Sequence, residues 1–70
     1  MPQRHINLSY IKEELKQIEA VKWDDEVAYQ KEIDLYIAVL SAISKGAKDA
    51  PELAKAVLKA QAIPYGRWTA

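Results

Sequence analysis

The most constraining feature of this 70-residue chain is an apolar run from Ile33 to Ile43, in which only Asp34 and Ser41 are polar. These two residues are seven positions apart, so on a helix they share one narrow strip and the other sides are apolar or aromatic. A helix on the outside of a small bundle usually exposes about half of its surface to water. The run therefore predicts a helix that is covered on most sides, by the rest of the chain or by another molecule.

The length of the chain limits how much cover it can supply. Seventy residues form one domain at most. A core of this size rarely contributes more than about 3–5 kcal/mol to the free energy of unfolding without an additional constraint. Cysteine is absent, which excludes disulfides and thiolate metal sites. Oligomerisation is the remaining common way to stabilise so small a core. We therefore expect one small helical domain over residues 1–70 that associates with another protein.

The N-terminal part predicts an arm followed by an outer helix. Residues 1–8 include Pro2 and show no clear periodicity. Asn7 or Ser9 can cap a helix over residues 9–22. Its apolar residues follow helical spacing and form a single stripe: Leu8, Ile11, Leu15 and Ile18.

The junction before the apolar run predicts the start of a second helix. Asp24 is a favourable N-cap, and Asp25 and Glu26 place negative charge in the first turn, where the helix dipole favours it. We expect this helix over residues 25–45, a length of roughly 30 Å. It ends before Gly46, a residue favoured in a left-handed C-cap.

The next polar segment predicts the start of a third helix. Asp49 is expected to be the N-cap, Pro51 falls in the first turn, and Glu52 completes a capping box. We expect this helix over residues 50–62, followed by a tail over residues 63–70. The larger side chains of the third helix lie toward one side: Leu53, Val57, Leu58 and Gln61.

Three helices with short links predict an all-α fold, a three-helix up-down-up bundle with a long central second helix and a C-terminal tail. The second helix has two apolar stripes, and the alanine-rich third helix has limited bulk to cover both of them. Each large side chain left exposed would forfeit roughly 1.5–3 kcal/mol. One stripe contains Tyr29, Ile33, Tyr36, Ile37, Leu40 and Ile43, and the other contains Leu35, Val39 and Ala42.

Two surfaces are therefore candidates for binding another protein. On the second helix the expected contact residues are Tyr29, Ile33, Tyr36, Ile37 and Leu40. The alternative is that the first and third helices cover this helix completely within a monomer. In the tail the expected contact residues are Tyr65, Arg67 and Trp68, which belong to residue types enriched in binding hot spots. Here the alternative is that Ile63 and Trp68 fold back and close one end of the bundle.

The formal charge is zero, but its distribution is uneven. The segment Ser9–Tyr36 has a net charge of −4, and the segment Ser44–Ala70 has a net charge of +3. Opposite charges at the two ends favour antiparallel or head-to-tail pairing, or steer separate partners to each end. The alternative is that both charged segments are ordinary solvated faces. The alternative function is a small nucleic-acid-binding regulator that uses the basic C-terminal half. Its candidate residues are Lys45, Lys48, Lys55, Lys59 and Arg67.

Other kinds of site have little support in the sequence. His5 is the only histidine and lies in the N-terminal arm, and there is no second histidine and no cysteine to complete a metal centre or a nucleophile–base pair. The two glycines are twenty residues apart, which excludes a glycine-rich phosphate loop. Residues 1–9 have no signal-peptide core, and the run of residues 33–43 is too short to span a bilayer. We expect no enzyme, no cofactor, no metal site and no membrane association.

The sequence as a whole predicts a small, non-enzymatic, cytoplasmic protein that functions by protein–protein interaction. Its expected form is a homodimeric adaptor, an accessory subunit or an inhibitor of a larger protein. Nothing in the sequence identifies the partner.

Overall fold

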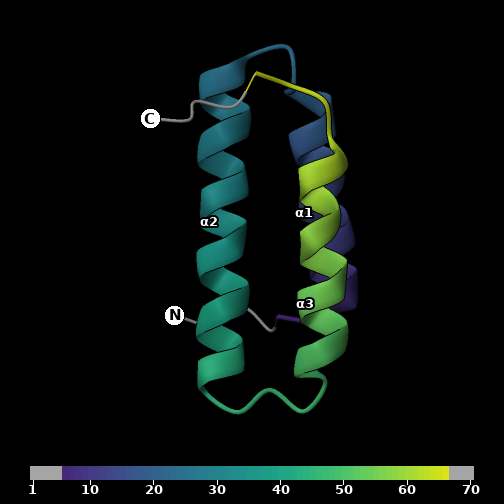
Figure 1. Cartoon of the computed structure of the whole chain (residues 1–70), viewed down its shortest axis with the longest axis vertical. Coiled ribbons are helices and arrows are strands. Elements are labelled where there is room, and N and C mark those ends of the chain that lie inside the picture. The colour runs from purple at the N-terminus through teal and green to yellow at the C-terminus, as the bar shows by residue number, and fades with distance from the viewer. Residues whose placement is uncertain (1–5, 67–70) are drawn as a thin grey trace.

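Three α-helices and one short 3₁₀-helix form most of residues 6–66, the part of the chain that the computed structural model describes. The helices are α1 (Leu8–Ala20), α2 (Asp25–Ser44), α3 (Ala50–Leu58) and η1 (Lys59–Ala62). The three α-helices run up, down and up, and each packs against the other two (Figure 1). The predicted all-α three-helix bundle is confirmed. Its central helix is the longest, with 20 residues against 13 in α1 and 9 in α3.

Polar side chains determine where the first two helices begin. The side-chain oxygen of Asn7 accepts a hydrogen bond from the backbone N–H of Tyr10 at 2.8 Å. Asp24 accepts one from the backbone N–H of Val27 at 3.3 Å. Both residues satisfy a backbone donor that the first helical turn leaves without a partner. The predicted starts of α1 and α2 therefore agree with the structure to within one residue.

A glycine ends α2. Gly46 has a φ of 93°, in the left-handed region that glycine adopts without a steric penalty. Its N–H donates to the carbonyl of Ile43 at 3.0 Å, and the N–H of Ala47 donates to the carbonyl of Ala42 at 3.2 Å. This pair of bonds is the Schellman motif, which satisfies the last carbonyls of the helix and turns the chain toward α3.

The capping box predicted for α3 is wrong in one respect. Asp49 occupies the N-cap position, but its side chain makes no capping hydrogen bond. Its backbone, at φ −106° and ψ 40°, lies outside the extended region typical of N-caps. The far end of this segment also differs from a regular helix, because the last turn tightens into η1 before the extended backbone of Ile63.

The core lies where the three helices meet. The largest fully buried side chains are Ile11 and Ile18 from α1, Leu35 and Val39 from α2, and Leu53 from α3. Burying each of them contributes about 1.5–3 kcal/mol to stability. The chain beyond η1 contributes as well, because Ile63 is only 8% exposed.

Candidate protein-interaction surface

One flank of α2 faces the core and the opposite flank faces outward. Leu35 and Val39 are 1% and 0% exposed, so the stripe that contains them is the core-facing one. Ile37 and Leu40, from the other stripe, are 58% and 64% exposed. The bundle therefore buries one of the two apolar stripes of α2 and leaves part of the other in contact with solvent.

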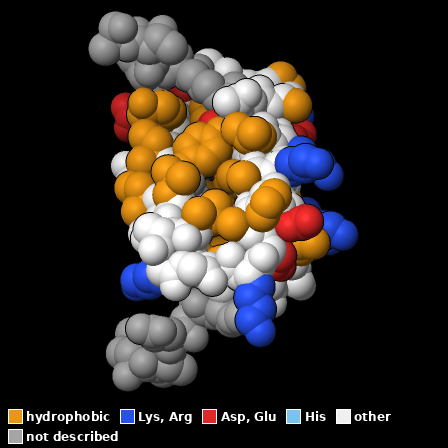
Figure 2. Space-filling model, turned by 60° about the horizontal axis from the view of Figure 1, so that its bottom comes forward, with side chains coloured by type: hydrophobic (Ala, Val, Ile, Leu, Met, Phe, Trp, Pro, Cys, Tyr) orange, Lys and Arg blue, Asp and Glu red, His pale blue; other side chains and the backbone are white. Residues whose placement is uncertain are grey.

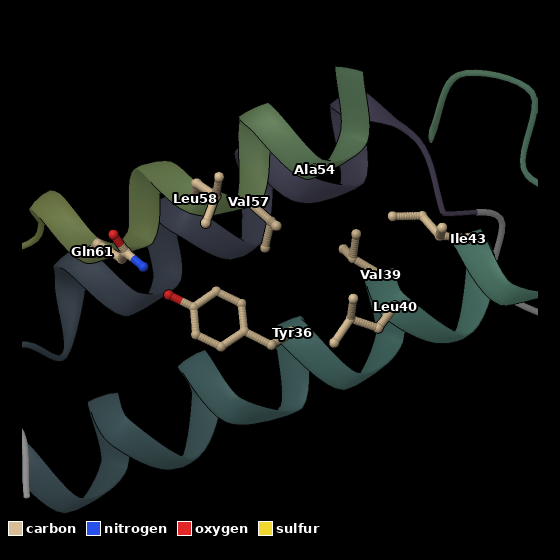
Figure 3. A pocket seen from close by; sticks show the side chains of 8 residues that line it. All are labelled: Tyr36, Val39, Leu40, Ile43, Ala54, Val57, Leu58 and Gln61. Atoms are coloured by element: carbon tan, nitrogen blue, oxygen red, sulfur yellow. The ribbon is translucent and has the colours of Figure 1, made fainter. Parts of the chain in front are cut away.

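An apolar groove of about 330 Å³ lies between α2 and α3. Figure 3 shows side chains from the two helices on opposite sides of it, with Tyr36 and Leu40 from α2 and Leu58 from α3. Leu58 is 54% exposed, so both walls present large apolar side chains to solvent. The groove is lined by Tyr36, Val39, Leu40, Ile43, Ala54, Val57, Leu58 and Gln61.

The groove belongs to a wider apolar surface. On the face shown in Figure 2, hydrophobic side chains gather in the middle and most charged side chains lie toward the margin. We define the α2–α3 surface as this groove together with the outward flank of α2. Exposed apolar patches with a polar margin are typical of protein-binding surfaces.

A buried carboxylate lies beside this surface. Glu32 on α2 is 4% exposed and accepts hydrogen bonds from the hydroxyls of Tyr36 and Tyr65. A buried carboxylate is costly unless it is hydrogen-bonded, and these two donors reduce that cost. Because the ring of Tyr36 also lines the groove, the cluster of Glu32, Tyr36 and Tyr65 connects the C-terminal segment to the α2–α3 surface.

The residues after η1 pack on the bundle as far as they are described. Tyr65 is partly buried, and the N–H of Gly66 donates to the carboxylate of Asp25 at 3.1 Å. Residues 63–66 thus follow the alternative in which the tail folds back onto the bundle. Arg67 and Trp68, the other two predicted contact residues of the tail, lie outside the described residues.

The predicted contact residues of the second helix differ in how exposed they are to solvent. Tyr29, Ile33 and Tyr36 are partly buried, whereas Ile37 and Leu40 are exposed. The structure brings Tyr36 and Leu40 together in the groove. Leu58 was not predicted as a contact residue, because in the sequence it falls on the same side of the third helix as the buried Leu53 and Val57. Glu32 was not predicted either, although the spacing of Ala28, Glu32, Leu35 and Val39 places that carboxylate within an apolar stripe.

The lysines named for the nucleic-acid alternative are spread along the bundle. Lys45 and Lys48 lie in the connection between α2 and α3, and Lys55 lies on α3. Lys59 begins η1, toward the other end of the molecule (Figure 1). Arg67, the fifth candidate, lies outside the described residues. The four described side chains are exposed, and none of them lines the groove between α2 and α3.

Within residues 6–66, no group of three or more His, Asp or Glu side chains could hold a metal ion. His5 lies outside the described residues. No helix in the described part of the chain has both the length and the apolar character of a membrane span. Comparison with protein-family models, with curated proteins and with solved structures found no match for this chain.

Proposed function

We propose that this chain functions by binding another protein through the α2–α3 surface, as a homodimeric adaptor, an accessory subunit or an inhibitor. The observation that supports this proposal is the exposure of three large apolar side chains on adjacent helices. Ile37, Leu40 and Leu58 are 58%, 64% and 54% exposed. They lie on or beside a groove that can accept a side chain from a partner.

The energetics favour association at this surface. Complete burial of a leucine or isoleucine side chain contributes about 1.5–3 kcal/mol, and these three residues obtain less than half of that within the monomer. A partner that covers them would gain the remainder without reorganising the core, because Leu35 and Val39 are already buried beneath. Tyr36 suits such an interface, since its ring can be covered while its hydroxyl remains bonded to Glu32.

Site-specific photo-crosslinking tests the proposal. A photoreactive phenylalanine analogue replaces Leu40 in one full-length variant and Glu13, exposed on α1, in a matched control. Both variants are irradiated in an extract of the cells that express the chain. We expect adducts at position 40 that excess wild-type chain suppresses and excess Ile37→Glu does not. Similar adducts at positions 40 and 13, or equal suppression by both competitors, would disprove the proposal.

A further inference from the structure

We infer that the partner of the α2–α3 surface is a second copy of this chain, with the two α2 helices packed antiparallel about a two-fold axis near Ile37. This inference rests on the proposed function, because it names the occupant of the same surface. It depends on two further observations: the symmetry of the outward residues of α2 and the opposite charges at the two ends of this helix.

The outward flank of α2 has the spacing of a helix–helix seam. Alternating steps of four and three residues place six side chains in one line along a helix. The middle of this line is apolar and both ends are polar. In order, the six residues are Glu26, Gln30, Ile33, Ile37, Leu40 and Ser44.

This seam is self-complementary when two copies run antiparallel. A two-fold axis near Ile37 places residues equally far before and after it opposite each other in the two copies. Gln30 and Ser44 are each seven residues from Ile37, so polar residues meet at both ends. Ile33 lies four residues before Ile37 and Leu40 three residues after it, so the two side chains come within one residue of facing each other and apolar residues meet near the centre. Each copy thus offers the same patch to the other, as a two-fold interface requires.

Charges at the two ends of α2 select the same direction. Glu26 lies in the first turn of α2, Lys48 lies in the connection that follows its C-terminal end, and both are exposed. Antiparallel pairing therefore brings Glu26 of each copy toward Lys48 of the other. Parallel pairing would instead bring Glu26 toward Glu26 and Lys48 toward Lys48, which is unfavourable. Charge complementarity thus favours a second copy in the antiparallel direction.

The size of the surface predicts a weak dimer. A standard interface buries about 800 Å² on each partner, roughly one sixth of the 5169 Å² accessible surface of this chain. A seam along one helix, flanked by Leu58 of α3, falls at or below that size. We therefore expect a dissociation constant on the order of 1–100 μM, which a concentration series can resolve.

The absence of native cysteine permits a direct test of direction. Full-length Glu26→Cys and Lys48→Cys variants are mixed and treated with a short bismaleimide, and mass spectrometry identifies the products. With the two variants at equal concentration, random pairing makes about half of all linked dimers mixed, and we expect the mixed Glu26→Cys/Lys48→Cys dimers to exceed that share clearly. A Glu13→Cys variant, with its thiol on the outward face of α1, gives the background from random collision. A majority of self-linked Glu26→Cys dimers would indicate parallel pairing and overturn the inference.

Charge reversal provides a second test that leaves the apolar seam intact. Glu26→Lys places like charges at both ends of the dimer, and we expect it to raise the dissociation constant about tenfold, measured by sedimentation at low salt. Adding Lys48→Glu in the same chain restores opposite charges and should recover most of the affinity. No recovery would contradict the antiparallel arrangement.

The proposed function and the second-copy inference can be disproved separately. A wild-type chain that is monomeric at all concentrations, but gives competed photo-adducts with another protein at position 40, overturns the second-copy inference and leaves the proposed function intact. A monomeric chain with no position-specific adducts overturns both.

Discussion

The hydroxyl of Tyr65 donates a hydrogen bond to the buried carboxylate of Glu32, thirty-three residues earlier in the chain. This contact joins the C-terminal segment to the middle of α2. The same carboxylate accepts a hydrogen bond from Tyr36, whose ring forms one wall of the groove between α2 and α3. One polar cluster therefore contributes both to the position of the C-terminal segment and to the wall of the groove.

Removing the Tyr65 hydroxyl should destabilise the bundle. Tyr65→Phe keeps the ring but leaves the buried Glu32 carboxylate with one donor fewer, at a cost of about 1–3 kcal/mol. Urea unfolding followed by circular dichroism measures this loss. Tyr29→Phe is the matched control, because no hydrogen bond of the Tyr29 hydroxyl is found among the described residues. A loss no larger in Tyr65→Phe than in Tyr29→Phe would show that the bond does not stabilise the fold.

A double-mutant cycle assigns the effect to the pair. Glu32→Gln and Tyr65→Phe are measured singly and together. Because the two side chains are in contact, we expect a coupling free energy of about 0.5–3 kcal/mol. If the losses in unfolding free energy were simply additive, the effect of Tyr65→Phe would not come from its contact with Glu32.

The two apolar stripes of α2 should respond differently to truncation. Leu35→Ala removes a side chain that is 1% exposed and should cost about 2–5 kcal/mol, enough to unfold much of so small a domain. Leu40→Ala removes one that is 64% exposed and should change the stability of the monomer by no more than about 0.5 kcal/mol. Thermal unfolding at low protein concentration separates monomer stability from association. Equal losses of stability in the two variants would mean that the side of α2 that carries Leu40 is buried in solution.

Most of the fold could be predicted from the sequence because local signals determine where the helices begin and end. Capping residues, a glycine at the end of α2 and apolar periodicity are encoded within a few neighbouring positions, and the helix bounds follow from them. Glu32 is only partly readable in this way: its spacing places it within an apolar stripe, but one of its two hydroxyl donors is thirty-three residues away in the chain. A glutamate is almost always a surface residue unless such a partner exists.

Packing decided the features of the site that local signals left open. The sequence identified two apolar stripes on α2, but the positions of α1 and α3 determine which one is buried. Leu58 illustrates the same point, because the packing of α3 leaves it 54% exposed while its neighbour Val57 is 7% exposed. At Asp49 the residue type favours an N-cap hydrogen bond, but the structure shows none and the backbone lies outside the extended region.

The two N-caps should therefore differ in their contribution to stability. Asn7→Ala removes a hydrogen bond of 2.8 Å to the N–H of Tyr10 and should cost about 0.5–2 kcal/mol. Asp49→Ala removes no capping hydrogen bond and should cost a few tenths of a kcal/mol through the helix dipole. Urea unfolding of the two variants in parallel measures the difference. If Asp49→Ala cost as much as Asn7→Ala, a capping bond at Asp49 would have to form in solution.

The two glycines should also respond differently to alanine. Gly46 has a φ of 93° and nothing within 4 Å of an added Cβ, so Gly46→Ala should cost about 1 kcal/mol through the backbone alone. At Gly66 an added Cβ would lie 2.7 Å from a carboxylate oxygen of Asp25, an exposed side chain that can rotate away. This rotation gives up the exposed hydrogen bond from the Gly66 N–H to Asp25, so Gly66→Ala should cost about 0.5 kcal/mol.

Comparing the two variants cancels a shared contribution, since both substitutions restrict the unfolded chain to a similar extent. The difference between their unfolding free energies thus isolates the left-handed backbone of Gly46. Gly46→Asn refines the measurement, because asparagine tolerates the left-handed region better than alanine and should recover part of the loss. A stability for Gly46→Ala equal to or above that of Gly66→Ala would mean that the end of α2 does not require the left-handed backbone conformation.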